Sequence, residues 1–196
     1  LYTDTEKKEE QQKNQRGIPS QQQLEQNQQA VQYSAAAIAA IFDTMFNIFH
    51  SRYPMCAKLS EAEVMFEGGV TDVLIPNQVT HKDKIARMCA LANQGDIKVC
   101  VDNLENVQTI SDIASAYGVK IGVLIEVETQ MNRAGVRSVE EGVAIAKLAE
   151  GLPGVNFKGV MSHQSLPEFT THEDRFKVGK ETIQSCLDVG NAIKAE

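Results

Sequence analysis

The stretch from residue 97 to residue 127, IKVCVDNLENVQTISDIASAYGVKIGVLIEV, decides the fold. It opens with a short apolar run, passes at Asn103 into a pattern with helical spacing, and returns to a second apolar run after Gly118. Asn is favoured at the start of a helix and Gly at its end, so both boundaries are marked. The helical positions expected to face the core are Val107, Ile110, Ala114 and Tyr117. A strand, a helix and a second strand in this order predict two parallel strands with the helix packed on one face.

The same alternation runs through most of the chain and predicts a parallel α/β fold. Mostly apolar strands separated by helices are typical of parallel sheets that helices cover. Right-handed crossovers leave a closed barrel or an open doubly wound sheet. Neither GxGxxG nor GxxxxGK[ST] follows any strand, so the nucleotide-binding open sheets lose support and a TIM-type (β/α) barrel is favoured. Strands are expected at residues 55–58, 72–76, 97–102, 120–127 and 156–162.

The length limits how much of such a barrel the chain holds. A complete barrel of eight β/α units usually takes about 250 residues, and the chain has 196. We therefore expect a partial barrel with about five of the eight units. The expected organisation is a Gln-rich segment at residues 1–30, an apolar helix and connection at residues 31–52, and the partial barrel at residues 53–196.

The first two of these parts differ in composition from the barrel. Residues 1–30 nearly lack apolar side chains, so they bury too little surface to offset their ordering entropy, and a disordered or loosely helical segment is expected. Residues 31–50 place apolar side chains at three- and four-residue steps, which predicts a core-facing helix. A helix that binds a partner or a membrane surface is the alternative. The apolar stripe consists of Ile38, Ile41, Phe42, Met45 and Phe49.

Helix starts in the barrel are marked by residue types that satisfy the free N–H groups of a first turn. Capping boxes are expected at Ser60 with Glu63 and at Ser138 with Glu141. Thr80 is expected to precede a further helix, and a last helix is expected over residues 171–195.

Charge and composition exclude several classes of protein. The formal net charge of −7 argues against a nucleic-acid-binding protein, which would carry a basic patch or stripe. The longest apolar stretch, residues 34–49, is interrupted by Asp43 and Asn47 and is too short to predict a membrane span. No signal-peptide pattern is visible, so a cytoplasmic location is expected. The wide spacing of the cysteines favours reduced, buried thiols over disulfides or zinc ligands. They are Cys56, Cys89, Cys100 and Cys186.

Polar residues follow the end of every predicted strand. In β/α barrels, function gathers at the carboxyl ends of the strands and in the loops that follow them. These residues are therefore a candidate binding ring, although turns between strands and helices are polar in any case. The ring consists of Lys58, Asn77, Gln78, Asp102, Asn103, residues 126–133, His163 and Gln164.

Several stretches of this kind also carry a family resemblance. CAKLSEAEVM (56–65), IPNQV (75–79), KVCVDN (98–103), MNRAGV (131–136) and SHQS (162–165) occur in this order. Together they resemble the alanine-racemase-type enzymes that use pyridoxal phosphate, also called fold type III. Within that group they are most similar to the branch of D-threonine aldolase, 3-hydroxyaspartate aldolase and D-serine dehydratase. The resemblance covers about residues 55–190 and implies pyridoxal phosphate as the cofactor.

The resemblance assigns roles to two residues. Arg133 matches the arginine that reaches the phenolic oxygen of the cofactor, a task that suits a permanently charged donor. His163 matches the residue whose imidazole packs against the pyridine ring. A solvated loop arginine and a structural histidine are the alternatives. Lys58 is expected to be structural or to face the phosphate, and a Schiff base there is the less favoured alternative. Asp102 and Asn103 are expected to end a strand and cap a helix.

The sequence also departs from the family pattern. The family holds its cofactor on a lysine in the first barrel strand, but no lysine lies between Lys13 and Lys58. Glu128 and Gln130 stand where the family has an acidic residue and a glycine, so a crowded or altered loop is expected. The last barrel strands, the phosphate-gripping loops and the C-terminal β-domain with its metal ligands are not represented. No metal site is therefore expected.

These points define the expected function. The chain is expected to be a fragment of a pyridoxal-phosphate lyase, inactive alone, whose intact relatives act on D-amino acids with a β-hydroxyl group. One alternative is a non-catalytic single-barrel protein that binds pyridoxal phosphate. Another is an interaction or structural remnant with residues 34–49 as the contact element. The resemblance also implies a homodimer as one possible assembly.

Overall fold

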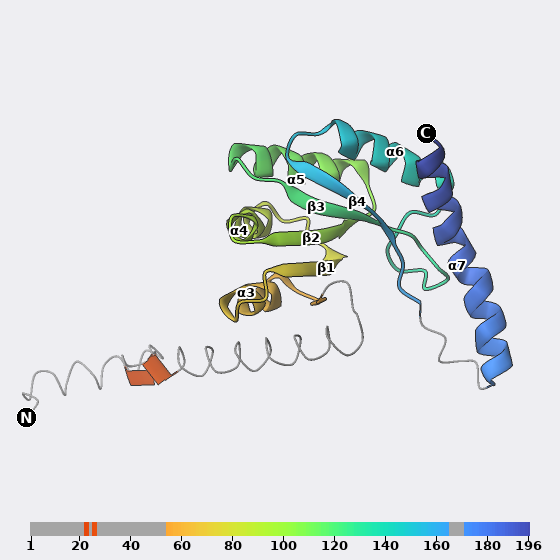
Figure 1. The fold of residues 1–196 in the computed structure, drawn as a ribbon, viewed down its shortest axis with the longest axis horizontal. Coiled ribbons are helices and arrows are strands. Elements are labelled where there is room, and N and C mark those ends of the chain that lie inside the picture. Colours follow the sequence, from red (N-terminus) through yellow and green to blue (C-terminus); the bar gives the residue numbers. More distant parts are fainter. Residues whose placement is uncertain (1–21, 24, 27–53, 165–170) are drawn as a thin grey trace, which may run out of the picture.

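The centre of the molecule is a four-stranded parallel sheet, described by a computed structural model that covers residues 22–23, 25–26, 54–164 and 171–196 (Figure 1). Its strands follow one another in the order β1-β2-β3-β4, so each strand pairs with its neighbour in sequence. This is the order of successive units in a β/α barrel. The predicted parallel α/β class is therefore confirmed. The strands are β1 (Asp72–Gln78), β2 (Asp96–Val101), β3 (Ile121–Glu126) and β4 (Val155–Met161).

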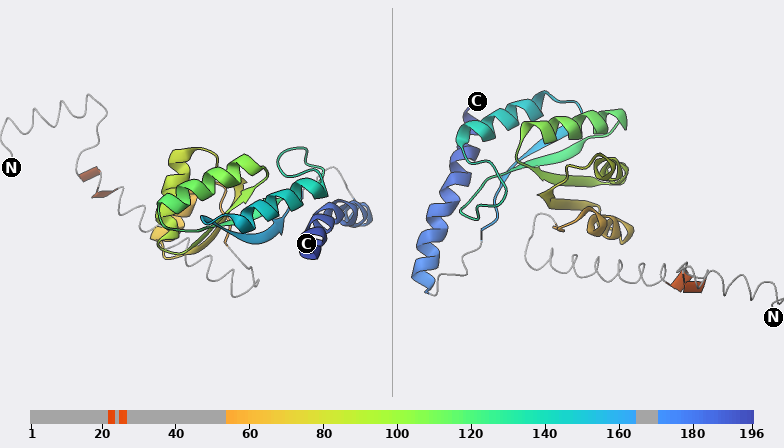
Figure 2. Two further views of the ribbon diagram at one scale, coloured as in Figure 1. Left: turned by 90° about the horizontal axis from the view of Figure 1, so that it is seen from above. Right: turned by 180° about the vertical axis from the view of Figure 1, so that it is seen from behind.

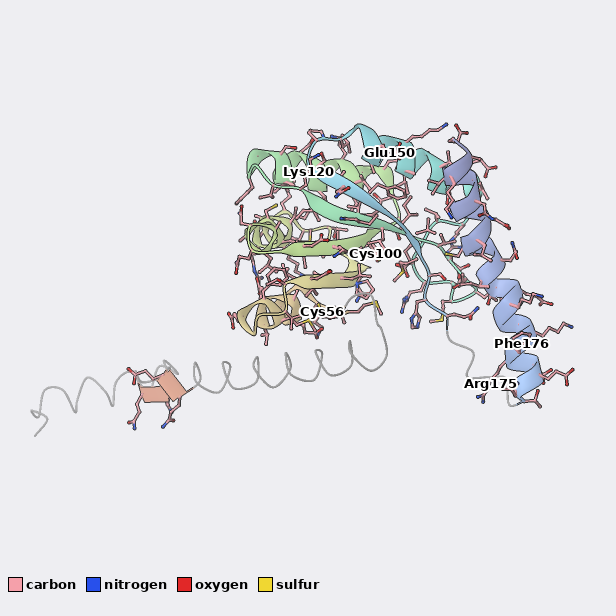
Figure 3. All side chains as sticks on the ribbon, viewed as in Figure 1. Cys56, Cys100, Lys120, Glu150, Arg175 and Phe176 are labelled. Atoms are coloured by element: carbon pink, nitrogen blue, oxygen red, sulfur yellow. The ribbon has the colours of Figure 1, made fainter. Side chains whose placement is uncertain are left out.

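Helices connect these strands and cover one face of the sheet. They are α3 (Leu59–Glu67), α4 (Lys82–Ala92), α5 (Leu104–Ala116), α6 (Val139–Gly151) and α7 (His172–Ala195). Figures 1 and 2 show α3, α4, α5 and α6 along one face, whereas α7 lies beside α6 at the β4 edge. The part of α7 that carries Arg175 and Phe176 extends past the sheet (Figure 3).

Alternation along the strands divides the apolar side chains between two faces of the sheet. The face toward the helices carries the main core. Its strand members include Val73, Ile75, Ile97, Val99, Val101, Ile121, Val123 and Ile125. On the opposite face, Leu74, Cys100 and Leu124 form a second small cluster, against which Met161 packs. This second face corresponds to the interior of a barrel.

A buried ion cluster lies on that inner face near the amino ends of the strands. The Lys98 side chain is only 1% exposed, and its Nζ contacts the carboxylate of Asp72 and lies 2.9 Å from Asp96 Oδ2. Lys158 Nζ lies 3.6 Å from the same Asp96 oxygen. A buried ammonium is tolerated only when it is paired, so the two carboxylates permit Lys98 to lie in this position.

The first predicted strand, residues 55–58, is reduced to a single parallel bridge between Met55 and Leu74. Cys56 N donates to Leu74 O at 3.1 Å, and Leu74 N donates to Pro54 O at 3.0 Å. The chain then enters α3, so the prediction of a full strand was wrong. The reason is local: the Glu61 carboxylate accepts hydrogen bonds from the backbone N–H groups of Ala57 and Lys58 and starts the helix there.

One predicted helix start is wrong for the same kind of reason. Ser60 lies inside α3 rather than at its cap, and Glu63 instead accepts a hydrogen bond from Arg87 Nε at 2.8 Å. Thr80 precedes α4 as predicted, and the N-cap of that helix is His81, whose Nδ1 accepts from the backbone N–H of Asp83. The correction at α3 moves the start of that helix by two residues.

Other predicted boundaries are confirmed. The side chains of Asn103, Ser138 and Thr171 each accept a backbone N–H in the first turn of α5, α6 and α7. One core prediction is wrong: Tyr117 is the C-cap of α5 and is 54% exposed. All four cysteines are free and buried, as predicted.

Two predicted segments are not tested. The apolar helix at residues 31–50 lies outside the described residues, as does most of the Gln-rich segment at residues 1–30. Within the described ranges, no helix combines the length and the apolar character that crossing a membrane requires.

Candidate functional site

The carboxyl ends of three strands bring polar side chains together on the inner side of the sheet. The central one is Glu126, the last residue of β3, whose side chain is 4% exposed. Its Oε2 accepts a hydrogen bond from Gln78 Nε2, at the end of β1, over 2.6 Å. Its Oε1 lies 3.5 Å from a terminal guanidinium nitrogen of Arg133. A buried carboxylate with an amide on one side and a guanidinium on the other fixes both neighbours.

A bulge in the sheet contributes to this arrangement. The pairing of β1 with β2 shifts register between Ile75 and Gln78, so that Gln78 rather than the preceding residues lies opposite Cys100. Such a bulge re-aims a side chain at a strand end. It places the Gln78 amide within reach of a carboxylate two strands away.

Arg133 lies in the loop between β3 and α6, which folds back onto the end of β3. Val136 N donates to Glu126 O at 2.9 Å, and Glu128 N donates to Val136 O at 3.0 Å. The Arg133 side chain is 52% exposed, so its guanidinium is tethered at one side and open to a ligand at the other. This is the geometry of a pre-positioned cation at the mouth of the partial barrel.

Tight backbone conformations shape this loop. Gln130 has a φ of 69° and Asn132 a φ of 48°, both in the left-handed region that glycine adopts at least cost. The family resemblance predicted that replacing glycine by Gln130 would alter this loop. Gln130 has a left-handed backbone, which a glutamine adopts with strain. Whether the loop differs from one with glycine stays a prediction. Asn132 N donates to the Glu128 carboxylate at 2.7 Å, which stabilises the turn.

Asp102 and Asn103, at the end of β2, stabilise the start of α5 and the loop that carries Arg133. Asn103 Oδ1 accepts the backbone N–H of Asn106 at 2.8 Å, so it caps α5 as predicted. Asp102 Oδ2 accepts the backbone N–H of Gly135 at 3.1 Å, and so ties the Arg133 loop to the neighbouring strand.

His163 follows β4 and is joined to the same loop through its backbone. Thr129, a buried residue, donates its hydroxyl to His163 O at 2.9 Å. The His163 side chain is exposed. Gln164, the next residue, donates to Gly179 O at 3.0 Å and contacts Thr182, which anchors this segment to α7. His163 and Arg133 therefore belong to segments that contact each other at one end of the sheet.

Lys58 is placed elsewhere. It is the exposed N-cap residue of α3, next to the edge strand β1, and lines a cavity with residues of β1 and α4. The structure thus brings Gln78, Glu126, Arg133 and the His163 segment together. Lys58 lies at the rim, in a cavity that Gln78 also lines.

Cys100 is the thiol nearest to this site. It lies on the inner face of β2 (Figure 3). Burial, together with the negative charges of Glu126 and Asp102, raises the pKa of Cys100 to about 12. A thiol with such a pKa stays protonated near neutral pH, so Cys100 is not a nucleophile.

Glu126 is the residue whose role the sequence pattern least revealed. The pattern placed it in the ring at strand ends but did not single it out. The sequence feature that could have identified it is a carboxylate at the end of a fully apolar strand, because such a group is buried only when it has partners.

Among the described residues, no group of three or more His, Cys, Asp or Glu side chains is arranged to hold a metal ion.

A parallel β/α sheet whose strands follow one another in sequence order, with polar groups gathered at its carboxyl end, is the arrangement of successive units in a β/α barrel. Comparison with known proteins makes the class specific. The family model described as "Alanine racemase, N-terminal domain" matches residues 50–190. The chain belongs to this family, as the motifs predicted.

Relatives agree with this assignment. The chain is 34% identical over 143 residues to a 3-hydroxy-D-aspartate aldolase of Paracoccus denitrificans, covering 72% of this chain and 37% of that protein. It is 37% identical over 140 residues to a D-threonine aldolase of Arthrobacter sp., covering 71% and 37% respectively. The crystal structure of D-threonine aldolase from Filomicrobium marinum matches with a TM-score of 0.75 and 27% identity, over 82% of this chain and 42% of that one. The chain thus spans less than half the length of these relatives.

Proposed function

We propose that this chain forms part of the active-site mouth of a pyridoxal-phosphate lyase that acts on D-amino acids with a β-hydroxyl group. The observation that carries the proposal is the Arg133 guanidinium, which Glu126 holds at the carboxyl end of the sheet. This is the residue that the family motif assigns to the phenolic oxygen of the cofactor. The aldolase relatives support the same reaction class.

The described residues fit two contacts with pyridoxal phosphate. Arg133 offers a half-exposed guanidinium, which suits an anionic phenolic oxygen because it is always charged and donates several hydrogen bonds. The exposed imidazole of His163, on the adjoining segment, suits packing against an aromatic ring. When bound, the cofactor supplies an electron-withdrawing ring that stabilises a carbanion. Glu126 would restrict the guanidinium to one orientation, so that less side-chain entropy is lost on binding.

Covalent attachment of pyridoxal phosphate to a lysine is the family feature with least support in this chain. The sequence between Lys13 and Lys58 contains no lysine. Lys58 is the candidate that remains near this end of the sheet, and it lies at the start of α3 rather than beside Arg133. We therefore propose that the chain by itself binds the cofactor without efficient catalysis. A non-catalytic pyridoxal-phosphate-binding protein is the second candidate.

Finer assignments belong to the same proposal. The reaction would be retro-aldol cleavage, or dehydration of the kind that a D-serine dehydratase performs, with a cytoplasmic location. A homodimer is the assembly that the family resemblance implies.

The test is a titration of the purified chain with pyridoxal phosphate, followed by borohydride reduction and peptide mapping. Arg133→Gln should weaken cofactor binding by about tenfold to a hundredfold, because a charge-assisted hydrogen bond contributes about 1.5–3 kcal/mol. Arg175→Gln removes the same charge from α7 and should leave binding unchanged. A borohydride-stable adduct on Lys58 would justify assays on D-threonine and D-serine. Saturable binding without an adduct would favour the non-catalytic candidate, and no binding would refute the proposal.

A further inference from the structure

A second candidate site lies at the rim of the sheet, beside the Arg133 mouth, and Gln78 borders both. A cavity of about 340 Å³ opens between the start of α3, the end of β1 and the start of α4. Figure 1 shows these two helices side by side next to the β1 edge. The volume falls within the range of about 300–1,000 Å³ that is usual for small-molecule sites.

Hydrogen bonds between separate elements fix the walls of this cavity. Asn77 Nδ2, at the end of β1, donates to Ala57 O at 2.8 Å and ties β1 to the segment before α3. Arg87 of α4 donates to Glu63 of α3 at 2.8 Å and joins the two helices. The cavity is therefore formed before any ligand arrives, which lowers the entropy lost on binding.

The lining of the cavity is basic in an acidic protein. The side chains of Lys58, His81, Lys84 and Arg87 all line it. No Asp or Glu is among the described residues that line it, although the chain has a net charge of −7. A concave surface lined by one sign of charge concentrates ions of the opposite sign.

Two of the basic side chains in this lining lack a carboxylate partner within the described part of the chain. Arg87 is paired with Glu63, and the exposed Asp83 lies 3.7 Å from His81 Nδ1. The ammonium groups of Lys58 and Lys84 have no such partner there, unlike that of Lys147, which lies 2.7 Å from Glu196. Two uncompensated positive charges match the charge of a dianion.

The floor of the cavity is apolar. Leu59, Ile75 and Val79 line it beside the cations, and all three are buried core residues. A ligand that covers this floor must carry a hydrocarbon or ring portion as well as its charge. Inorganic anions alone would leave the apolar part of the cavity unused.

We propose that this cavity binds a small organic dianion, either a phosphate monoester or a dicarboxylate, with its charge at Lys58 and Lys84 and its apolar part over Ile75 and Val79. This inference does not rest on the proposed function, because it requires neither Arg133 nor pyridoxal phosphate. It assigns Lys58 to anion binding at the rim.

Amide NMR of the purified chain at low ionic strength tests the proposal. Phenyl phosphate and succinate are titrated separately, with sodium chloride at matched ionic strength as the reference. We expect saturable shifts at the start of α3 and α4 with at least one organic anion, and the tighter of the two identifies the anion class. Lys58→Gln and Lys84→Gln should each weaken that binding about threefold or more at low salt.

Lys82→Gln is the matched control, since Lys82 is exposed on the first turn of α4 but does not line the cavity. Equal losses in all three variants would mean general attraction to a basic surface and would overturn the proposal. Shifts no larger than those with chloride would overturn it as well. Unchanged shifts elsewhere in the spectra of the variants establish that each one is folded.

Discussion

At Gly135 the backbone of the Arg133 loop passes closest to β3. Its φ is 106°, and a Cβ built there would lie 2.6 Å from the backbone nitrogen of Glu128. A side chain would clash with main-chain atoms in a conformation that L-residues rarely adopt. We expect Gly135→Ala to lower the free energy of unfolding by about 2–4 kcal/mol, measured by urea denaturation.

The matched control for Gly135 is Gly151, the last residue of α6. A Cβ there meets no atom within 4 Å. Gly151→Ala should leave stability unchanged or raise it by up to about 1 kcal/mol, because alanine is the better helix former. Similar losses in both variants would contradict the packing described for the Arg133 loop.

The sequence predicted some residues of the candidate site and not others. The MNRAGV motif predicted where Arg133 lies in the chain, and the strand-end position predicted which end of the sheet it occupies. Its partner Glu126 was not singled out. The hydrogen bond between Gln78 and Glu126, which marks Glu126 as part of the site, depends on the bulge that turns Gln78 inward. A bulge is a property of two strands in register and has no signature within one of them.

At the scale of elements, the start of α3 has a specific cause. The Glu61 carboxylate accepts the backbone N–H groups of Ala57 and Lys58 at 2.8 and 3.2 Å, whereas Ser60 is an exposed residue within the helix. Glu61→Ala should therefore lower the free energy of unfolding by about 1 kcal/mol, the usual effect of losing a cap.

Ser60→Ala is the informative comparison for α3. It should be neutral or slightly stabilising, since alanine has the higher helix propensity and no cap is lost. Chemical denaturation of the two variants under identical conditions measures the difference. A larger loss for Ser60→Ala than for Glu61→Ala would restore the capping box that the sequence pattern predicted.

The elements themselves were largely predictable, and their ends were not. Apolar runs and helical spacing identified β1 to β4 and the helices between them, because burial imposes these periods on the sequence. The cap of α4 at His81 was not predicted, because an imidazole nitrogen serves as the cap there in place of a hydroxyl. Tyr117 was misplaced because the helical period continues into a residue that ends the helix.

At the scale of the whole molecule, buried thiols make stability depend on alkaline pH. Burial raises the pKa of both Cys56 and Cys100 from 9.0 to about 12. Their stabilisation is complete below about pH 9 and is lost as the pH rises toward 12, since the unfolded chain releases these protons first. The free energy of unfolding should fall by up to about 1.4 kcal/mol per pH unit for each thiol in this range.

Urea denaturation from about pH 8 to pH 10.5 measures this slope. Cys100→Ala should show a shallower slope than the parent chain, whatever its stability at neutral pH, because one of the two buried thiols is gone. Identical slopes would mean that Cys100 ionises in the folded state. Lysines and tyrosines titrate in the same range, so the difference between the two proteins is the relevant quantity.

The inner face of the sheet has one more consequence for the molecule. The Lys98 cluster occupies the amino ends of the strands and the Glu126 group the carboxyl ends, with Leu74, Cys100 and Leu124 between them. This apolar belt separates the two polar groups along the described strands, so the Lys98 cluster and the Glu126 group lie apart on the same face.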